Sequence, residues 1–99
     1  MTDSNTSINE RRVWVFQGEG ATFPCAVYTD LKLAEDWIAE NLVSGLLTAY
    51  PLNQSLYDWV SEQGLWTPQE PNQKTPKFIQ QFSSAYAEHY HYQDGIRNG

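Results

Sequence analysis

The chain has 99 residues, of which 40% are hydrophobic and 14% aromatic, which fits one folded domain and excludes a disordered chain. Twelve acidic and six basic side chains give a net charge of -6, which disfavours binding to nucleic acid or to an anionic membrane. There is one cysteine, no secretory signal in the polar start, and no apolar run near the roughly 20 residues that span a bilayer. These features predict a cytoplasmic protein.

Residues 1–10 are polar and predict a disordered tail, so one domain is expected over residues 11–95, with residues 96–99 frayed. Residues 12–17 and 22–29 are rich in β-branched and aromatic side chains and are separated by the sequence GEGA. The two glycines permit a turn with positive φ, so this region predicts a β-hairpin. A phosphate-binding loop is disfavoured because the Gly-Lys-Ser/Thr ending is missing.

Cys25 alternates with Phe23 and Val27 on the second expected strand, which places it among apolar neighbours. This position predicts an inert, buried thiol. The alternative, a nucleophile activated by a histidine elsewhere in the chain, stays open.

A helix is expected over residues 30–43, with Asp30 as its N-cap and Gly45 just beyond its end. Its apolar positions follow helical spacing and form one stripe: Ala34, Trp37, Ile38 and Leu42. Residues 46–51 are short, apolar and β-prone and predict a strand. A short helix over residues 55–63 would start at a Ser55 cap.

The last expected helix covers residues 76–90, because Thr75 and Pro76 form a strong helix start. Its apolar positions are Phe78, Ile79, Phe82, Tyr86 and Tyr90. The order of elements predicts an α+β fold, with a small, mostly antiparallel sheet and two main helices packed on one face.

Both histidines, His89 and His91, lie near the end of this expected helix. Two residues apart on a helix they point roughly 200° away from each other, so no metal site is expected, although on a strand they would share a face. Packed or surface imidazoles at a helix C-terminus are the favoured interpretation.

Aromatic and polar residues concentrate between Tyr50 and Trp66, and fourteen aromatic side chains are many for one small core. Tyr and Trp are common anchors in protein interfaces, so some of these rings are expected to be exposed for binding. The candidate binding residues, with the histidines included, are Tyr50, Tyr57, Asp58, Trp59, Trp66, His89 and His91.

Four stretches, VWVFQGEGATFP, DWIAENLVSGLLTAYPL, YDW followed by a glycine, and EHYHYQDG, resemble a family of small bacterial proteins described as a domain of unknown function. The resemblance covers residues 12–95 and rests on aromatic, Gly and Pro positions. It implies a shared fold and a bacterial origin, and it implies no chemistry. The matching positions are Trp14, Gly18, Gly20, Trp37, Tyr50, Pro51, Tyr57, Asp58, Trp59, His89, His91 and Gly95.

The sequence favours a non-enzymatic protein-interaction or regulatory module, of which a toxin-immunity protein is one example, that needs no cofactor. Its negative charge would steer a basic partner, and self-association is a further option. The alternative is a small metal-dependent or hydrolytic enzyme that uses His89 and His91 with Asp58, Glu88 or Asp94.

Overall fold

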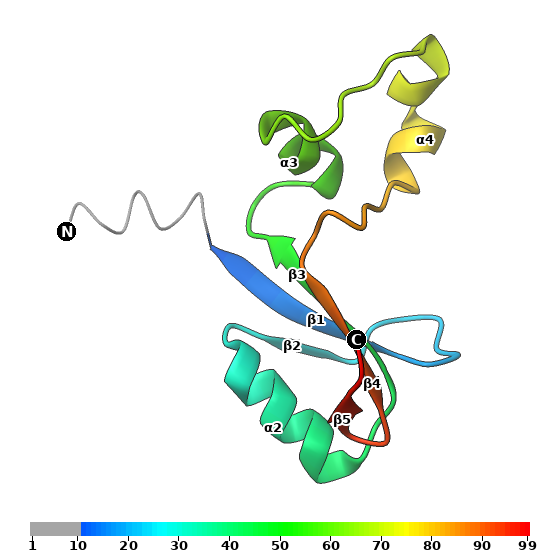
Figure 1. Ribbon diagram of the computed structural model, residues 1–99. Coiled ribbons are helices and arrows are strands. Elements are labelled where there is room, and N and C mark those ends of the chain that lie inside the picture. Colours follow the sequence, from blue (N-terminus) through cyan, green and yellow to red (C-terminus); the bar gives the residue numbers. More distant parts are fainter. Residues whose placement is uncertain (1–10) are drawn as a thin grey trace, which may run out of the picture.

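The computed structural model describes residues 11–99, so the expected tail over residues 1–10 lies outside the described residues (Figure 1). Within the described range, five strands form one antiparallel sheet with the strand order β2-β1-β3-β4-β5. The strands are β1 (Arg12–Gly18), β2 (Ala26–Tyr28), β3 (Gly45–Pro51), β4 (His89–Gln93) and β5 (Ile96–Arg97). The α+β class and the antiparallel sheet predicted from the sequence are confirmed.

The predicted hairpin is present, because β1 pairs antiparallel with β2. Gly20 adopts a φ of 78° in the connecting turn, as the sequence suggested. The second strand is shorter than expected, and Cys25 just before it is exposed. The prediction of a buried thiol was therefore wrong, since the regular alternation of the strand does not extend back to Cys25.

Helix α2 (Leu31–Asn41) covers one face of the sheet, as Figure 1 shows. Ala34 and Ile38 are fully buried there, and they share the main core with Trp14, Phe16, Leu47, Ala49 and Tyr92. The helix ends earlier than expected, because Leu42 takes the left-handed conformation with a φ of 55°. Gly45, the predicted helix-ending residue, instead begins β3.

The short helix was predicted correctly and is α3 (Leu56–Glu62). The Ser55 side chain accepts a hydrogen bond of 3.0 Å from the backbone N–H of Asp58, which makes Ser55 a true N-cap. A 3₁₀ helix, η1 (Pro71–Lys74), follows and leads into α4 (Pro76–Gln80).

The expected helix over residues 76–90 is wrong beyond its first turns. It begins at Pro76 as predicted, but α4 ends at Gln80, and His89 begins a strand. The Ser84 side chain accepts a hydrogen bond from the backbone N–H of Tyr86, a local contact that competes with helical hydrogen bonding. Residues 89–93 then alternate between the two faces of the sheet and gain backbone bonds from β3, which a helix could not provide.

The C-terminal residues expected to fray also belong to the sheet. Ile96 and Arg97 form β5, and the backbone N–H of Asn98 donates to the carbonyl of His91 at 2.8 Å. Figure 1 shows α4 beside α3, beyond the end of the sheet and away from the face that α2 covers. The prediction that both main helices pack on one face is therefore corrected.

A second aromatic cluster holds α3 and α4 together. It consists of Tyr57, Trp66, Phe78 and Phe82, whose ring centroids lie 5.1 to 6.4 Å apart. The Tyr57 hydroxyl donates a 2.7 Å hydrogen bond to the carbonyl of Gln73 and so links α3 to η1. The described residues are thus arranged around two apolar centres, with overall dimensions of 44 × 40 × 20 Å.

Candidate interaction face and histidine pair

The sheet has a second face, opposite α2, which we call the open face. Side chains alternate across a strand, and Trp14, Phe16, Leu47 and Tyr92 point toward α2. Their neighbours in the strands therefore point the other way, and the pairing register sets them side by side. The open face consists of Val13, Val15, Gln17, Val27, Leu46, Thr48, Tyr50, His89 and His91.

Large side chains are exposed on the open face. Val27 is 61% exposed and Tyr50 38% exposed, although each has a strand neighbour that faces the core. Figure 1 shows α2 on the other side of the sheet, whereas α3 reaches the open face only at one end, where Leu56 lines the hollow beside Tyr50. An apolar and aromatic sheet surface is therefore left uncovered.

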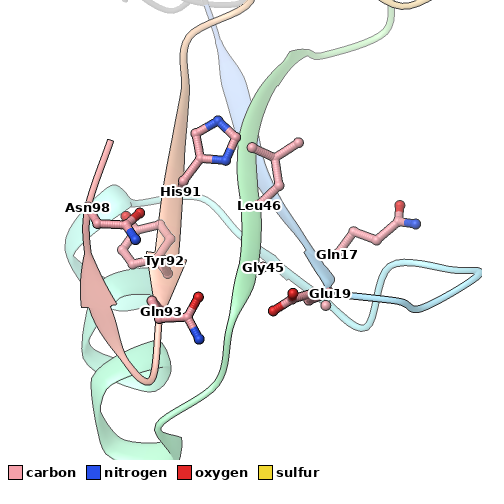
Figure 2. A pocket seen from close by; sticks show the side chains of 9 residues that line it. Gln17, Glu19, Gly45, Leu46, His91, Tyr92, Gln93 and Asn98 are labelled. Carbon is pink, nitrogen blue, oxygen red and sulfur yellow. The ribbon is translucent and has the colours of Figure 1, made fainter.

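Three hollows meet on the open face at Leu46. The first, of about 560 Å³, reaches from Gln17 and Glu19 to His91. Figure 2 shows His91 and Leu46 side by side on adjacent strands, with Gln17 and Glu19 across the hollow. The second, of about 260 Å³, holds both histidines, and the third, of about 300 Å³, runs from Thr48 toward Pro24.

His89 and His91 both belong to this face, because β4 sets residues two apart on the same side. Their ring centroids lie 5.6 Å apart with an angle of 82° between the ring planes. Nδ1 of His89 is 2.8 Å from the carbonyl oxygen of Ala87, and a carbonyl can only accept, so Nδ1 carries the proton. In the neutral imidazole with this tautomer, the lone pair is on Nε2.

The other predicted binding residues divide into two groups. Tyr50 lines the histidine hollow, and Trp66 lines an adjoining hollow of about 500 Å³ that shares residues 83–85 with it. Tyr57 packs inside the second aromatic cluster and serves the fold. Asp58 lies exposed in the first turn of α3, and Trp59 is half-buried on that helix. Neither lines the hollows of the open face.

A search of known protein families gives a match to most of this chain. The family model described as Domain of unknown function (DUF7710) matches residues 13–98. The chain belongs to this family. The matched range contains the whole open face and both histidines. Comparison with curated proteins and with solved structures found no match.

The carboxylates named for a hydrolytic site do not converge on the histidines. Glu88 is held by Arg12 at 2.6 Å and accepts a hydrogen bond from the Tyr90 hydroxyl, and the Tyr90 ring stacks on core-facing Trp14. No carboxylate lines the hollow that holds both histidines. Over residues 11–99, no group of three or more His, Cys, Asp or Glu side chains could hold a metal ion.

A row of charged and aromatic side chains, which sequence reasoning missed, crosses β3 on the α2 side of the sheet and links β1 to β4 and β5. The Arg12 guanidinium lies 5.4 Å from the Trp14 ring, Trp14 stacks on Tyr90 at 5.9 Å, and Arg97 lies 3.8 Å from the Tyr90 ring. Arg97 also binds Glu35 of α2 at 2.5 Å. The residues of this row come from four elements, β1, β4, β5 and α2. They meet only when the strands pair and α2 packs on the sheet, so the row could not be predicted from the sequence.

The carboxylates at the two ends of this row have shifted pKa values. Hydrogen bonds from Tyr90 and then Arg12 lower the pKa of Glu88. Burial alone would raise the pKa of Glu35, but hydrogen bonds from Tyr92 and Arg97 outweigh it, and that pKa is lowered as well. Both groups are therefore ionised and engaged in structural contacts at neutral pH.

Sequence reasoning also missed Gln17, Leu46 and Thr48 as members of the candidate site. A signal for the first of these existed: residues 13–17 alternate in a strand, which leaves one side chain in two on the face away from the core. The strand order decides which residues meet across that face, and it is not readable from the sequence. The described residues contain no helix long and apolar enough to cross a membrane.

Proposed function

We propose that this protein is an interaction module that binds a basic protein partner through the open face. The observation that supports this function is the sheet surface itself, where Leu46 and Tyr50 lie beside two hollows of mixed apolar and polar lining, and a third hollow with a mostly polar lining adjoins them at Leu46. Exposed aromatic residues beside concave apolar surface are typical anchors of protein interfaces. Tyr50 and Leu46 are the expected anchors.

Contact through the face is favoured over contact through a sheet edge. A partner that adds a strand needs a long row of unpaired backbone groups at an edge. Here the two edge strands, β2 and β5, have three and two residues. Beyond β5, the backbone N–H of His91 donates to the carbonyl of Gly99, which covers more of the β4 edge.

The net charge supports a partner of opposite sign. A chain with a formal charge of -6 repels a second copy of itself and repels nucleic acid, whereas it attracts a basic protein. The single cysteine is exposed, which supports residence in a reducing compartment, and we place the protein in a bacterial cytoplasm.

Site-specific photo-crosslinking tests the proposal in the cells from which the protein comes. A photoreactive residue replaces Gln17 on the open face, and a matched one replaces Glu40, which is exposed on α2. The Gln17 position is expected to give one discrete adduct with a basic protein, and the Glu40 position none. The yield should fall as ionic strength rises, because salt screens the attraction.

Two charge-matched variants sharpen this experiment. Leu46→Glu places a carboxylate at the centre of the open face and is expected to abolish the adduct. Leu33→Glu adds the same charge at a side chain that is 51% exposed on α2 and should leave it intact. Equal adducts from both crosslinking positions, or an adduct with the mass of two copies of this chain, would overturn the proposal.

A further inference from the structure

The two histidines form an arrangement that the proposed function does not use. A metal site was not expected from the sequence, because the side chains of residues two apart on a helix point in different directions. That objection is removed, because β4 is a strand and both imidazoles lie on the open face. They are also the only two histidines of the chain.

The spacing of the rings fits two ligands of one ion. With metal–nitrogen distances of about 2.0–2.1 Å, two ligating imidazoles have their ring centroids about 4.5 Å apart at the 90° angle of a tetragonal Cu²⁺ site and about 5 Å apart at a tetrahedral angle. The observed centroid separation is 5.6 Å, close to this range, and a rotation of the exposed His91 ring alone would leave the contact of His89 with Ala87 in place. His91 is exposed and His89 half-buried at the wall of a hollow, so an ion can reach both from solvent.

The hydrogen bond of His89 prepares it as a ligand. Ligating histidines generally donate their other ring N–H to a carbonyl or a carboxylate, which fixes the tautomer and the ring orientation. Nδ1 of His89 makes this contact with Ala87 at 2.8 Å, and Nε2 is left as the free nitrogen. One half of the site is therefore oriented before any ion binds.

The surroundings define which ion fits. Two neutral nitrogen ligands suit Cu²⁺, Ni²⁺ or Zn²⁺, whereas Mg²⁺ and Ca²⁺ need oxygen ligands. The remaining lining of the histidine hollow is neutral, with hydroxyl groups from Thr48, Tyr50, Ser83 and Ser84. Two protein ligands leave coordination positions open for water, unlike the four-ligand set of a structural zinc site.

We propose that His89 and His91 form a bidentate imidazole site on the open face for a divalent transition-metal ion, with Cu²⁺ bound more tightly than Zn²⁺. The order of affinity follows the general preference of nitrogen ligands among these ions. The site is a property of the isolated chain and does not depend on the protein partner proposed above.

Titration of the untagged, full-length protein with Cu²⁺ tests this site. The measurements use a Cys25→Ser background, because the exposed thiol would bind or reduce Cu²⁺. Calorimetry and electron paramagnetic resonance are expected to show one Cu²⁺ per chain with two nitrogen ligands. Zn²⁺ should bind to the same site more weakly.

Single substitutions separate a chelate from scattered binding. His89→Gln and His91→Gln are each expected to weaken Cu²⁺ binding at least about 100-fold, because the second ligand acts at high effective concentration. Glu88→Gln, next to His89 in the chain but with its carboxylate held by Arg12 and Tyr90, should leave the affinity unchanged.

Circular dichroism confirms that each variant keeps its fold. Undiminished Cu²⁺ affinity in the His89→Gln, His91→Gln double variant would overturn the site, and so would a loss caused by only one of the single substitutions. Neither result would bear on the crosslinking experiment, which reports on the partner-binding proposal separately.

Discussion

At Gly45 the backbone of the neighbouring strand β1 leaves no room for a side chain. A Cβ atom built there would lie 2.3 Å from the carbonyl oxygen of Gln17 and 2.8 Å from the Cα atom of Gly18. The obstacle is backbone in the paired strand β1, which cannot turn away as a side chain can. Gly45 therefore allows β1 and β3 to approach at the start of β3.

The substitution Gly45→Ala is expected to lower the free energy of unfolding by about 3 kcal/mol, a value typical of strain introduced at a packed backbone position. Gly64→Ala is the matched control, because Gly64 has a φ of 74° but open space around the position of a Cβ atom. Gly64→Ala should lower the free energy of unfolding by only about 1 kcal/mol, because a residue with a Cβ atom is less stable than glycine in the left-handed conformation. Urea denaturation of both variants measures the difference, and equal losses would contradict the steric argument.

The raised pKa of Tyr92 predicts that the free energy of unfolding falls at alkaline pH. Burial first, and then the hydrogen bond to Glu35, raise the pKa of Tyr92 from 10.0 to about 12. The phenol ionises near pH 10 in the unfolded chain but resists ionisation in the folded one. Its stabilising contribution is therefore complete below pH 10 and disappears as the pH rises toward 12.

Tyr92→Phe should make the free energy of unfolding fall less steeply across this pH range, because the buried ionisable group is gone. Urea unfolding at several pH values measures the slope. Tyr86→Phe is the control, since Tyr86 is 61% exposed and should leave the slope unchanged. An unchanged slope in the Tyr92 variant would show that this residue does not dominate the alkaline response.

Among the elements, α2 and α3 differ in how their N-termini are capped. Ser55 accepts a hydrogen bond from the third residue of α3, whereas Asp30, the residue at the same position of α2, makes no side-chain cap bond. The sequence predicts a cap at both positions equally well. Only the side-chain conformation distinguishes them.

Ser55→Ala is expected to lower the free energy of unfolding by about 1 kcal/mol, the usual value of an N-cap hydrogen bond. Asp30→Ala should cost clearly less, because no cap bond is lost there. Thermal and urea unfolding of the two variants, measured side by side, give the comparison. If Asp30→Ala is the more damaging change, the capping argument fails for this chain.

Helix starts were predictable from the sequence, and the ends of elements were not. The starts at Ser55 and Thr75 depend on local bonds between neighbouring residues, which the sequence records directly. The strand from His89 depends on its partner β3, whose paired residues lie 41 to 47 positions earlier in the chain, and the apolar spacing around Phe82 resembled that of a helix across the same region. The alternation of His and Tyr over residues 89–92 was the strand signal available.

The candidate site was partly predictable for the same reason. Tyr50, Trp66, His89 and His91 were identified by residue type, and all four line hollows in the structure. Their meeting with Leu46 and Gln17 depends on the strand order, which local signals do not determine. The sequence therefore identifies side chains suited to binding, but it does not show which of them meet on the open face, because strand pairing decides that.

At the scale of the whole molecule, the two apolar centres make the protein open in shape. Its radius of gyration is 15.2 Å, whereas a compact domain of this length has about 13 Å. One centre lies between α2 and the sheet, and the other is the second aromatic cluster between α3 and α4. The open face lies on the side of the sheet away from the first centre and is bordered at one end by residues 83–85.

Because the main core and the second aromatic cluster are separate, the sheet and the pair α3 and α4 are expected to differ in local stability. The sheet is held by continuous backbone pairing and by fully buried Phe16, Ile38 and Leu47, whereas α3 and α4 have seven and five residues and depend on the aromatic cluster. Short helices gain most of their stability from packing. The amides of α3 are therefore expected to exchange with deuterium more readily than those of β1 and β3.

Two core substitutions test whether the levels are separate. Trp66→Ala should accelerate exchange in α3 and α4 and leave β1 and β3 protected, because Trp66 contacts only the second cluster among the aromatic contacts of residues 11–99. Ile38→Ala removes a fully buried side chain of the main core and should accelerate exchange throughout, with a loss of about 2–5 kcal/mol. If Trp66→Ala accelerated exchange in β3 as much as in α3, the chain would unfold as one unit, and the border of the open face would be as rigid as the sheet.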